Sequence, residues 1–237
     1  MASEIPGPRR AIMAEFLGTA FLVMAVVGSG IMAERLSNGN AAIALLANAL
    51  ATGAALLALI ATFAPVSGAH FNPVVTAMFC TNGSMPWRAL PAYLSAQCAG
   101  AVAGTAFANF MFGLAPLHLS HKARLNEHQF VAEIIATFGL LTVIWAGWWT
   151  NSDRGMFTVS AYIVAAYWFT SSTSFANPAV TIGRIFSDTF AGIRWTDAIV
   201  FIGAQCIGMV LVIALCRRIM PKSPPMDKEV PILERVR

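Results

Sequence analysis

The sequence predicts an all-α membrane protein with six transmembrane helices and two re-entrant half-helices, arranged as an inverted 3+3 repeat. Three observations predict this class: little charge, long charge-free runs and an internal duplication. The chain has 237 residues, of which 57% are hydrophobic and 11% charged, and its mean hydropathy is +0.68. Soluble domains carry about 25% charged residues. The composition therefore excludes a disordered chain, a nucleic-acid-binding module and an ordinary soluble enzyme.

The spans follow from where charge is missing. A transmembrane helix needs about 20 predominantly apolar residues. Asp, Glu, Lys and Arg are absent from residues 16–33, 36–87, 89–121, 134–152, 155–183 and 198–216. We predict six spans, at about 11–33, 41–62, 88–110, 129–149, 157–170 and 197–216. Two apolar stretches remain, near 68–82 and 174–187, and each is too short to cross a bilayer.

The basic residues predict the orientation. Arg9 and Arg10 precede a first apolar run that is too long for a signal peptide, so we take this run as the first span. An even number of spans places both termini on one side. Cytoplasmic termini put ten of the 15 Lys and Arg residues inside, and positive charge is typical of cytoplasmic loops. We therefore predict a multi-pass protein of the cell membrane (the inner membrane if bacterial), with a proline-rich cytoplasmic tail at about 219–237.

The chain contains an internal duplication in which three motifs recur in the same order. Residues 14–19 (AEFLGT) recur at 132–137 (AEIIAT), 71–76 (FNPVVT) at 176–181 (ANPAVT), and 96–102 (AQCAGAV) at 204–210 (AQCIGMV). One channel domain, 1–237, would then consist of repeats at about 11–110 and 129–216. Three spans per repeat give the halves opposite orientations. Inverted repeats of this kind place a solute site at the membrane midplane.

Each short apolar stretch contains an Asn-Pro pair that signals a helix start. Asn accepts backbone N–H bonds as an N-cap, and Pro fits the first helical position. About ten helical residues separate Pro73 from the expected stop at Asn82-Gly83, which gives about 15 Å, or half a bilayer core. The alternative is two unrelated loop turns, but the repeat on both sides of each motif favours two half-helices whose N-termini meet at the midplane.

Such a meeting point favours neutral solutes. The helix N-termini place positive dipole ends in mid-pore, and Asn72 and Asn177 add amide donors. A neutral solute accepts these hydrogen bonds, whereas a cation meets a repulsive field and cannot recover its hydration shell. The non-helical chain that leads into each half-helix must line a water-filled path, because bare backbone cannot face lipid.

These motifs resemble the signatures of the aquaporin and aquaglyceroporin family (major intrinsic proteins). Residues 67–76 (SGAHFNPVVT) are similar to the first signature, with Val74 where Ala is usual, and residues 175–179 (FANPA) to the second. The resemblance, over 11–216, implies the aquaporin fold, a homotetramer in the lipid bilayer with one pore per subunit, and passive flux without cofactor, metal or catalysis. The pore boxes are then Asn72, Pro73, Val74, Asn177, Pro178 and Ala179.

Two acidic residues, Glu15 and Glu133, lie inside predicted spans. Such residues are functional or paired, so a proton-coupled transporter is one alternative. The resemblance instead implies that each carboxylate braces a re-entrant loop, with Gln97 and Gln205 at similar helix–loop junctions. His70 is expected to brace its loop on the cytoplasmic side of the pore rather than to bind a metal.

The resemblance also maps the selectivity filter, by counting from the two Asn residues, onto Thr52, Ala165, Ser174 and Val180. Val180 stands where the family normally has Arg, so we expect a wide, weakly polar filter that passes neutral solutes larger than water. Five hydroxyl residues at 170–174 either assist hydroxylated solutes or form a polar external loop.

Bacterial wide-filter members associated with arsenic-resistance operons share Thr52, Val180 and the second box. We therefore expect a channel for water and glycerol, with arsenite or methylated arsenicals as further solutes. In a second alternative, Arg184 lies one helical turn beyond Val180 and leans over it, which would give a water-selective channel. A closed, structural membrane protein is a third alternative.

Overall fold

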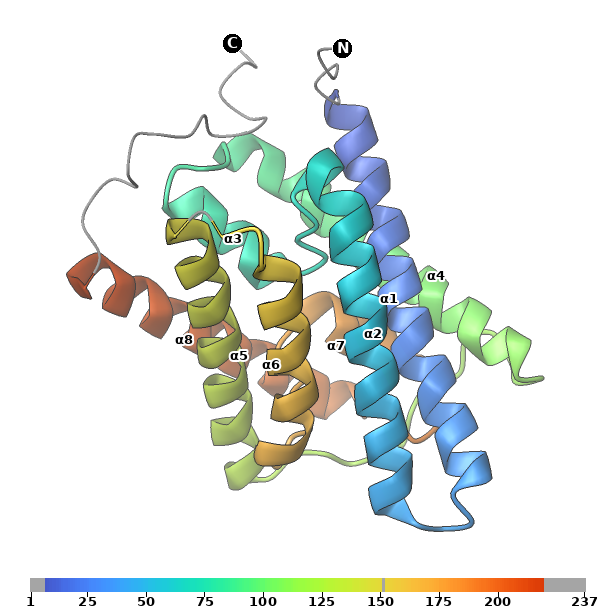
Figure 1. The fold of residues 1–237 in the computed structure, drawn as a ribbon. Coiled ribbons are helices and arrows are strands. Elements are labelled where there is room, and N and C mark those ends of the chain that lie inside the picture. Colours follow the sequence, from blue (N-terminus) through green and yellow to red (C-terminus); the bar gives the residue numbers. More distant parts are fainter. Residues whose placement is uncertain (1–6, 151, 220–237) are drawn as a thin grey trace.

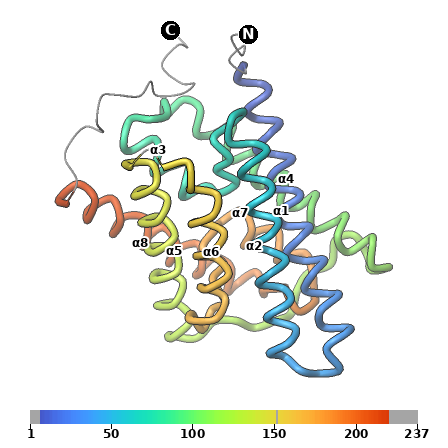
Figure 2. The backbone as a smooth tube through the Cα atoms, in the orientation of Figure 1, coloured from blue at the N-terminus to red at the C-terminus, as the bar shows by residue number. Residues whose placement is uncertain are grey.

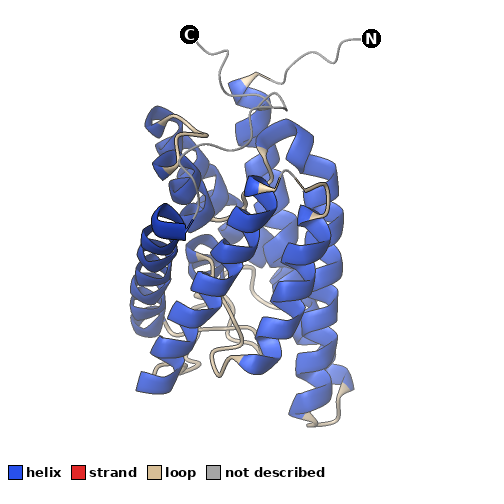
Figure 3. Ribbon diagram, turned by 60° about the vertical axis from the view of Figure 1, so that its left-hand side comes forward, coloured by secondary structure: helices blue, strands red, loops and turns tan. Residues whose placement is uncertain are grey.

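A computed structural model describes residues 7–150 and 152–219, and the regular structure in this part of the chain is entirely helical (Figure 3). The elements are α1 (Pro8–Leu36), α2 (Ala41–Ser67), α3 (Pro73–Thr81), the short 3-10 helix η1 (Trp87–Ala89), α4 (Leu90–Met111), α5 (Glu127–Trp149), α6 (Gly155–Phe169), α7 (Pro178–Arg184) and α8 (Trp195–Ile219).

Six of these helices correspond to the six predicted spans, and α3 and α7 correspond to the two short stretches. By length and composition, α1, α2, α5 and α8 are each able to cross a membrane, and α6 is a shorter apolar helix. One boundary differs by more than three residues: α2 continues through Pro65 to Ser67 instead of ending near residue 62. The predicted tail beyond Ile219 lies outside the described residues.

The two halves run in opposite directions. In Figure 1, α1 descends from the end of the molecule at the top, whereas α5, its counterpart in the second repeat, ascends from the opposite end. The tube in Figure 2 shows the same reversal for α2 and α6. Within the halves, α1 packs against α2 and α4, and α5 packs against α6 and α8. The fold thus confirms the inverted repeat of the aquaporin architecture.

Small residues allow the helices of each half to approach closely. A Cβ atom added at Gly100 or Gly104 of α4 would overlap the backbone carbonyl of Phe16 or Ala20 in α1. In the second half, a Cβ at Gly208 of α8 would lie 2.8 Å from the carbonyl oxygen of Ile134 in α5. Glycine at these positions permits the backbone contact that transmembrane helices use for packing.

The two half-helices begin with side-chain caps. The Asn72 Oδ1 accepts from the Val74 N–H at 3.1 Å, and the Asn177 Oδ1 accepts from the Ala179 N–H at 2.9 Å. Gly68, in the left-handed region at φ 87°, ends α2 and turns the chain inward. The non-helical segments that lead into α3 and α7 are buried in the protein at Ala69, Phe71, Phe175 and Ala176.

Candidate functional site

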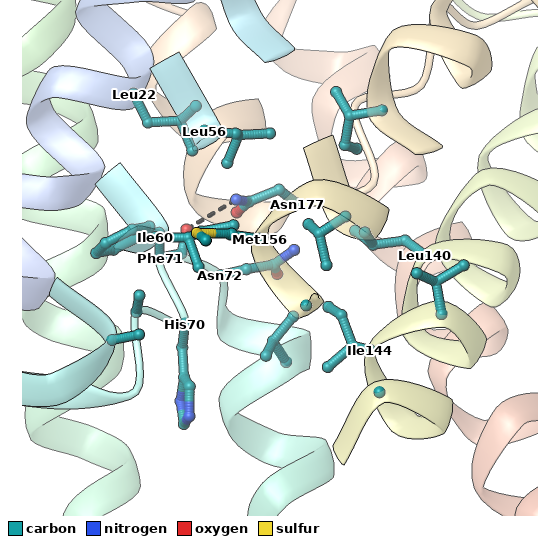
Figure 4. Close-up of a pocket in the computed structure, with 18 of the residues that line it drawn as sticks. Leu22, Leu56, Ile60, His70, Phe71, Asn72, Leu140, Ile144, Met156 and Asn177 are labelled. Atoms are coloured by element: carbon teal, nitrogen blue, oxygen red, sulfur yellow. Dashed lines mark hydrogen bonds between the residues drawn. The ribbon is translucent and has the colours of Figure 1, made fainter. Parts of the chain in front are cut away.

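The two Asn-Pro boxes meet at the centre of the molecule. The Asn72 Nδ2 donates to the Ala176 carbonyl oxygen at 2.8 Å, and the Asn177 Nδ2 donates to the Phe71 carbonyl oxygen at 2.8 Å. Figure 4 shows the second bond and the two amides side by side. Each box therefore holds the loop of the other repeat, and the N-termini of both half-helices converge on one point.

Glu15 braces the first loop and is completely buried. Its Oε1 accepts from the Ser67 hydroxyl at 2.7 Å and the His70 N–H at 2.9 Å. Its Oε2 accepts from the Phe71 N–H at 2.7 Å and the Gln97 Nε2 at 2.8 Å. Four donors thus fix the re-entrant backbone just before the first box.

Glu133 repeats the arrangement in the second loop. It accepts from the Ser172 hydroxyl at 2.6 Å, the Phe175 N–H at 2.8 Å and the Ala176 N–H at 3.0 Å, and from the Gln205 Nε2 at 2.8 Å. Ser67 and Ser172 were not predicted as members of these networks, although each follows from the other through the duplication. Neither carboxylate lines the central cavity.

A cavity of about 550 Å³ passes the Asn pair. Its volume far exceeds the roughly 30 Å³ that one water occupies in the liquid. Around Asn72 and Asn177, much of the wall is apolar (Figure 4). The labelled apolar side chains of this wall are Leu22, Leu56, Ile60, Leu140, Ile144 and Met156. A solute at the centre therefore finds amide groups as well as hydrocarbon around it.

Three of the four predicted filter residues line the cavity, and one does not. Thr52, Ser174 and Val180 line it and are buried in the protein. Ala165 is exposed on α6 and is not among the lining residues, so the structure does not support its place in the filter. Tyr167, two residues later, lines the cavity instead.

Tyr167 was missed by sequence reasoning. Its phenolic oxygen lies 3.2 Å from the Thr52 Oγ1, so the two hydroxyls form a polar pair at the cavity wall. One signal was available: a Tyr hydroxyl inside a span needs a polar partner. Of the five hydroxyl residues at 170–174, only Ser174 lines the cavity, and its Oγ has no hydrogen-bond partner among the described residues.

Arg184 also lines the cavity, and its side chain does not face lipid because the residue is only 2% exposed. Its Nε donates to the Ala191 carbonyl oxygen. Its guanidinium carbon lies 3.4 Å from the ring centroid of Phe175, a second lining residue that was not predicted. The structure thus places a cation at the same end of the cavity as Val180.

The connection between α4 and α5 brings two more cations to this end of the molecule. The Lys122 Nζ donates to the Phe190 carbonyl oxygen at 2.9 Å, and the Arg124 Nη2 donates to the same oxygen at 2.7 Å. Burial, together with the smaller effect of the neighbouring Arg124, lowers the pKa of Lys122 to about 8. Burial lowers the pKa of Arg124 to about 10, which leaves it charged at neutral pH.

His70 lies at the other end of the cavity, facing away from the Asn pair (Figure 4). Its Nδ1 is 3.1 Å from the Thr76 Oγ1, and its ring stacks on Phe79 with centroids 4.8 Å apart. Trp148 and Asp153 line the same end, beside the α5–α6 connection, and sequence reasoning did not predict them. Among the described residues, no group of three His, Cys, Asp or Glu side chains is placed to hold a metal ion.

Comparisons with known proteins agree with this geometry. The family model described as "Major intrinsic protein" matches residues 3–165. Aquaglyceroporin AqpS of Rhizobium meliloti (strain 1021) is 47% identical over 220 residues, which cover 93% of this chain and 94% of that protein. Aquaporin NIP1-3 of Oryza sativa subsp. japonica is 33% identical over 207 residues, which cover 84% of this chain and 70% of that protein.

A solved structure shares the fold. The X-ray structure of the aquaglyceroporin from Plasmodium falciparum matches with a TM-score of 0.70 at 20% sequence identity, covering 90% of this chain and 97% of that one. At this identity the likeness concerns the fold alone.

Proposed function

The chain belongs to the major intrinsic protein family, and on that premise we propose that it is a passive membrane channel for small neutral solutes. Members of this family are channels and not enzymes. Water and glycerol are the first solutes of the proposal, since a relative of nearly the same length is named an aquaglyceroporin. Uncharged arsenite and methylated arsenicals are its further solutes.

The observation that carries the proposal is the cavity at the Asn pair. Two helix N-termini and two amides lie in a mostly apolar cavity, so a solute with a few oxygen atoms and no net charge fits the site. Val180, Thr52 and Ser174 are small, uncharged lining residues toward one end. This lining supports passage of solutes larger than water.

The surroundings of Glu15 and Glu133 do not favour the alternative of a proton-coupled transporter. A relay carboxylate must exchange protons with the transport path. Glu15 and Glu133 each accept four hydrogen bonds from donors that hold the loops, and neither lines the cavity. If either carboxylate were protonated, its new O–H group would point at an N–H or O–H group that already donates to the carboxylate.

The proposal includes a homotetramer in a lipid bilayer. Large apolar side chains are exposed on the outer faces of the long helices, among them Phe21 of α1, Phe110 of α4 and Ile199 of α8. Exposed apolar surface of this extent is typical of contact with lipid or with further subunits. Cytoplasmic termini and the cell membrane remain part of the proposal.

A light-scattering panel on purified protein in liposomes tests the function. We expect fast shrinking and reswelling with glycerol and arsenite, measurable water flux, and no uphill accumulation under an imposed pH gradient. Vesicles that behave like protein-free liposomes, or uphill accumulation driven by the gradient, would contradict the proposal.

Val180→Arg tests the filter within the same panel. A guanidinium at position 180 narrows the path, so we expect glycerol and arsenite flux to fall far more than water flux. Val180→Leu is the matched control, because it adds bulk without charge or donors. An equal fall for all three solutes in Val180→Arg would show that position 180 does not select by solute size.

A further inference from the structure

Arg184 stands at the last position of α7, four residues beyond Val180. Four residues make about one helical turn, and helical side chains lean toward the helix N-terminus. The side chain of Arg184 therefore extends back toward position 180. Both residues line the same cavity, together with Ser174 and Tyr167.

The guanidinium is held on one edge only. The Nε donates to the Ala191 carbonyl oxygen, and the planar group lies over the Phe175 ring. Cation–ring contacts of this kind fix an arginine without neutralising it. Within the described residues, the two terminal nitrogens of Arg184 donate no hydrogen bond, and no carboxylate forms an ion pair with it.

A second cation supports the arrangement. Arg124 lies over the same Phe175 ring, with its guanidinium carbon 5.3 Å from the centroid. It donates to the carbonyl oxygens of Phe190 and Gly192, on either side of the Ala191 carbonyl that holds Arg184. Two positive groups and one ring thus form a fixed unit at this end of the cavity.

From this geometry we infer that Arg184 supplies the cationic selectivity group of the pore, from a position one turn beyond the one that the sequence leaves as Val180. Its charge repels cations, and its free N–H groups bind the oxygen atoms of neutral hydroxylated solutes. The lining is then uncharged at Val180 and charged at Arg184. The inference rests on the proposed channel function.

The experiment compares Arg184→Gln with the parent protein in liposomes that carry a potassium- or proton-sensitive dye. Removing the charge should raise cation leak per channel by at least about tenfold, which corresponds to about 1.4 kcal/mol of barrier. Glycerol flux should persist. Arg35→Gln is the charge-matched control, because Arg35 is exposed, donates to the Phe112 carbonyl oxygen and does not line the cavity.

The possible outcomes separate the inference from the proposed function. A folded Arg184→Gln channel that conducts glycerol and leaks cations no faster than the parent overturns the inference and leaves the proposed function intact. A parent protein without glycerol flux overturns the proposed function itself.

Arg184→Lys keeps the test decisive if the glutamine variant does not fold. In the same surroundings, lysine loses its proton at a lower pH than arginine does. Cation leak through the lysine variant should therefore rise at a lower pH than any rise seen in the parent. Both proteins contain the same charged and titratable neighbours, so the leak of the parent shows how much of the pH dependence comes from these neighbours. They are Arg124, Lys122, Glu133 and Tyr167. A leak with the same pH dependence in both proteins would overturn the inference.

Discussion

Glu133 shows at the level of one residue how the pore depends on a group that lies outside it. Its two oxygens accept two backbone N–H groups, a serine hydroxyl and the Gln205 amide. Hydrogen bonds to a charged acceptor contribute about 1.5–3 kcal/mol each. Because two of the donors are consecutive backbone amides, the carboxylate fixes the direction in which the second loop enters the centre.

We predict that Glu133→Gln destabilises the protein by about 3–5 kcal/mol, the usual cost of breaking a buried charged network. The NH₂ group of the new glutamine cannot accept a hydrogen bond, so donors that now bind the carboxylate would lose their acceptor. Thermal unfolding in detergent should show the loss as a lower midpoint, and Glu15→Gln should match it because its network is equivalent. Glu127→Gln is the control, since that side chain is 87% exposed. A Glu133→Gln midpoint as high as that of the control would contradict the bracing role.

Residues with a copy in the second repeat were predictable from the sequence. Asn72, Glu15 and Gln97 each have a counterpart, and a duplicated polar residue inside an apolar span is a strong signal. Tyr167 has no such copy, so no internal comparison predicts it, whereas helix geometry alone predicted that Arg184 leans back toward Val180.

The error at Ala165 has a geometric cause. The segment before the second box contains Thr173, Ser174 and Ala176 in the left-handed region, at φ 61°, 50° and 47°. A count of residues across such a segment does not fix which face of α6 turns inward. Two positions along a helix differ by about 200°, so Tyr167 faces the cavity and Ala165 faces out.

At the level of the helices, the contact between α1 and α4 depends on missing side chains. Gly100 and Gly104 meet the backbone of α1 directly, so no rotamer change can relieve an added atom. The two glycines lie four residues apart on one face of α4, and this spacing was visible in the sequence. The helix that they contact, α1, was not predictable, because spacing alone does not show which helix lies opposite.

We predict that Gly100→Ala lowers stability by about 1–3 kcal/mol, as overpacked cores do. The matched control is Gly203→Ala in α8, where an added Cβ meets nothing within 4 Å. Thermal unfolding of both variants in the same detergent provides the comparison. If both midpoints equal that of the parent, α1 and α4 are not in backbone contact at this position.

At the level of the whole molecule, the α4–α5 connection and the α5–α6 connection lie at opposite ends (Figure 1). His121 is exposed in the first connection and Arg154 in the second. If the termini are cytoplasmic, as the basic residues predict, the first connection faces outward.

We therefore expect His121→Cys, in a background without the four native cysteines, to react with an impermeant maleimide on intact cells. Arg154→Cys should react only after the membrane is permeabilised. The reverse pattern would show that the predicted orientation is wrong, and the cysteine-free parent reports background labelling.

The reciprocal Asn bonds have a consequence for the order in which the chain is made. The Asn72 side chain bonds to Ala176, which is 104 positions later, and the Phe71 carbonyl bonds to Asn177, which is 106 positions later. The ribosome adds about 5–20 residues per second, so the first loop waits for several seconds before its partner exists. During that interval Glu15 and Gln97, both encoded in the first half, are the groups that can hold the loop. The carboxylate brace is therefore encoded, together with the loop that it holds, before the second half of the chain is made.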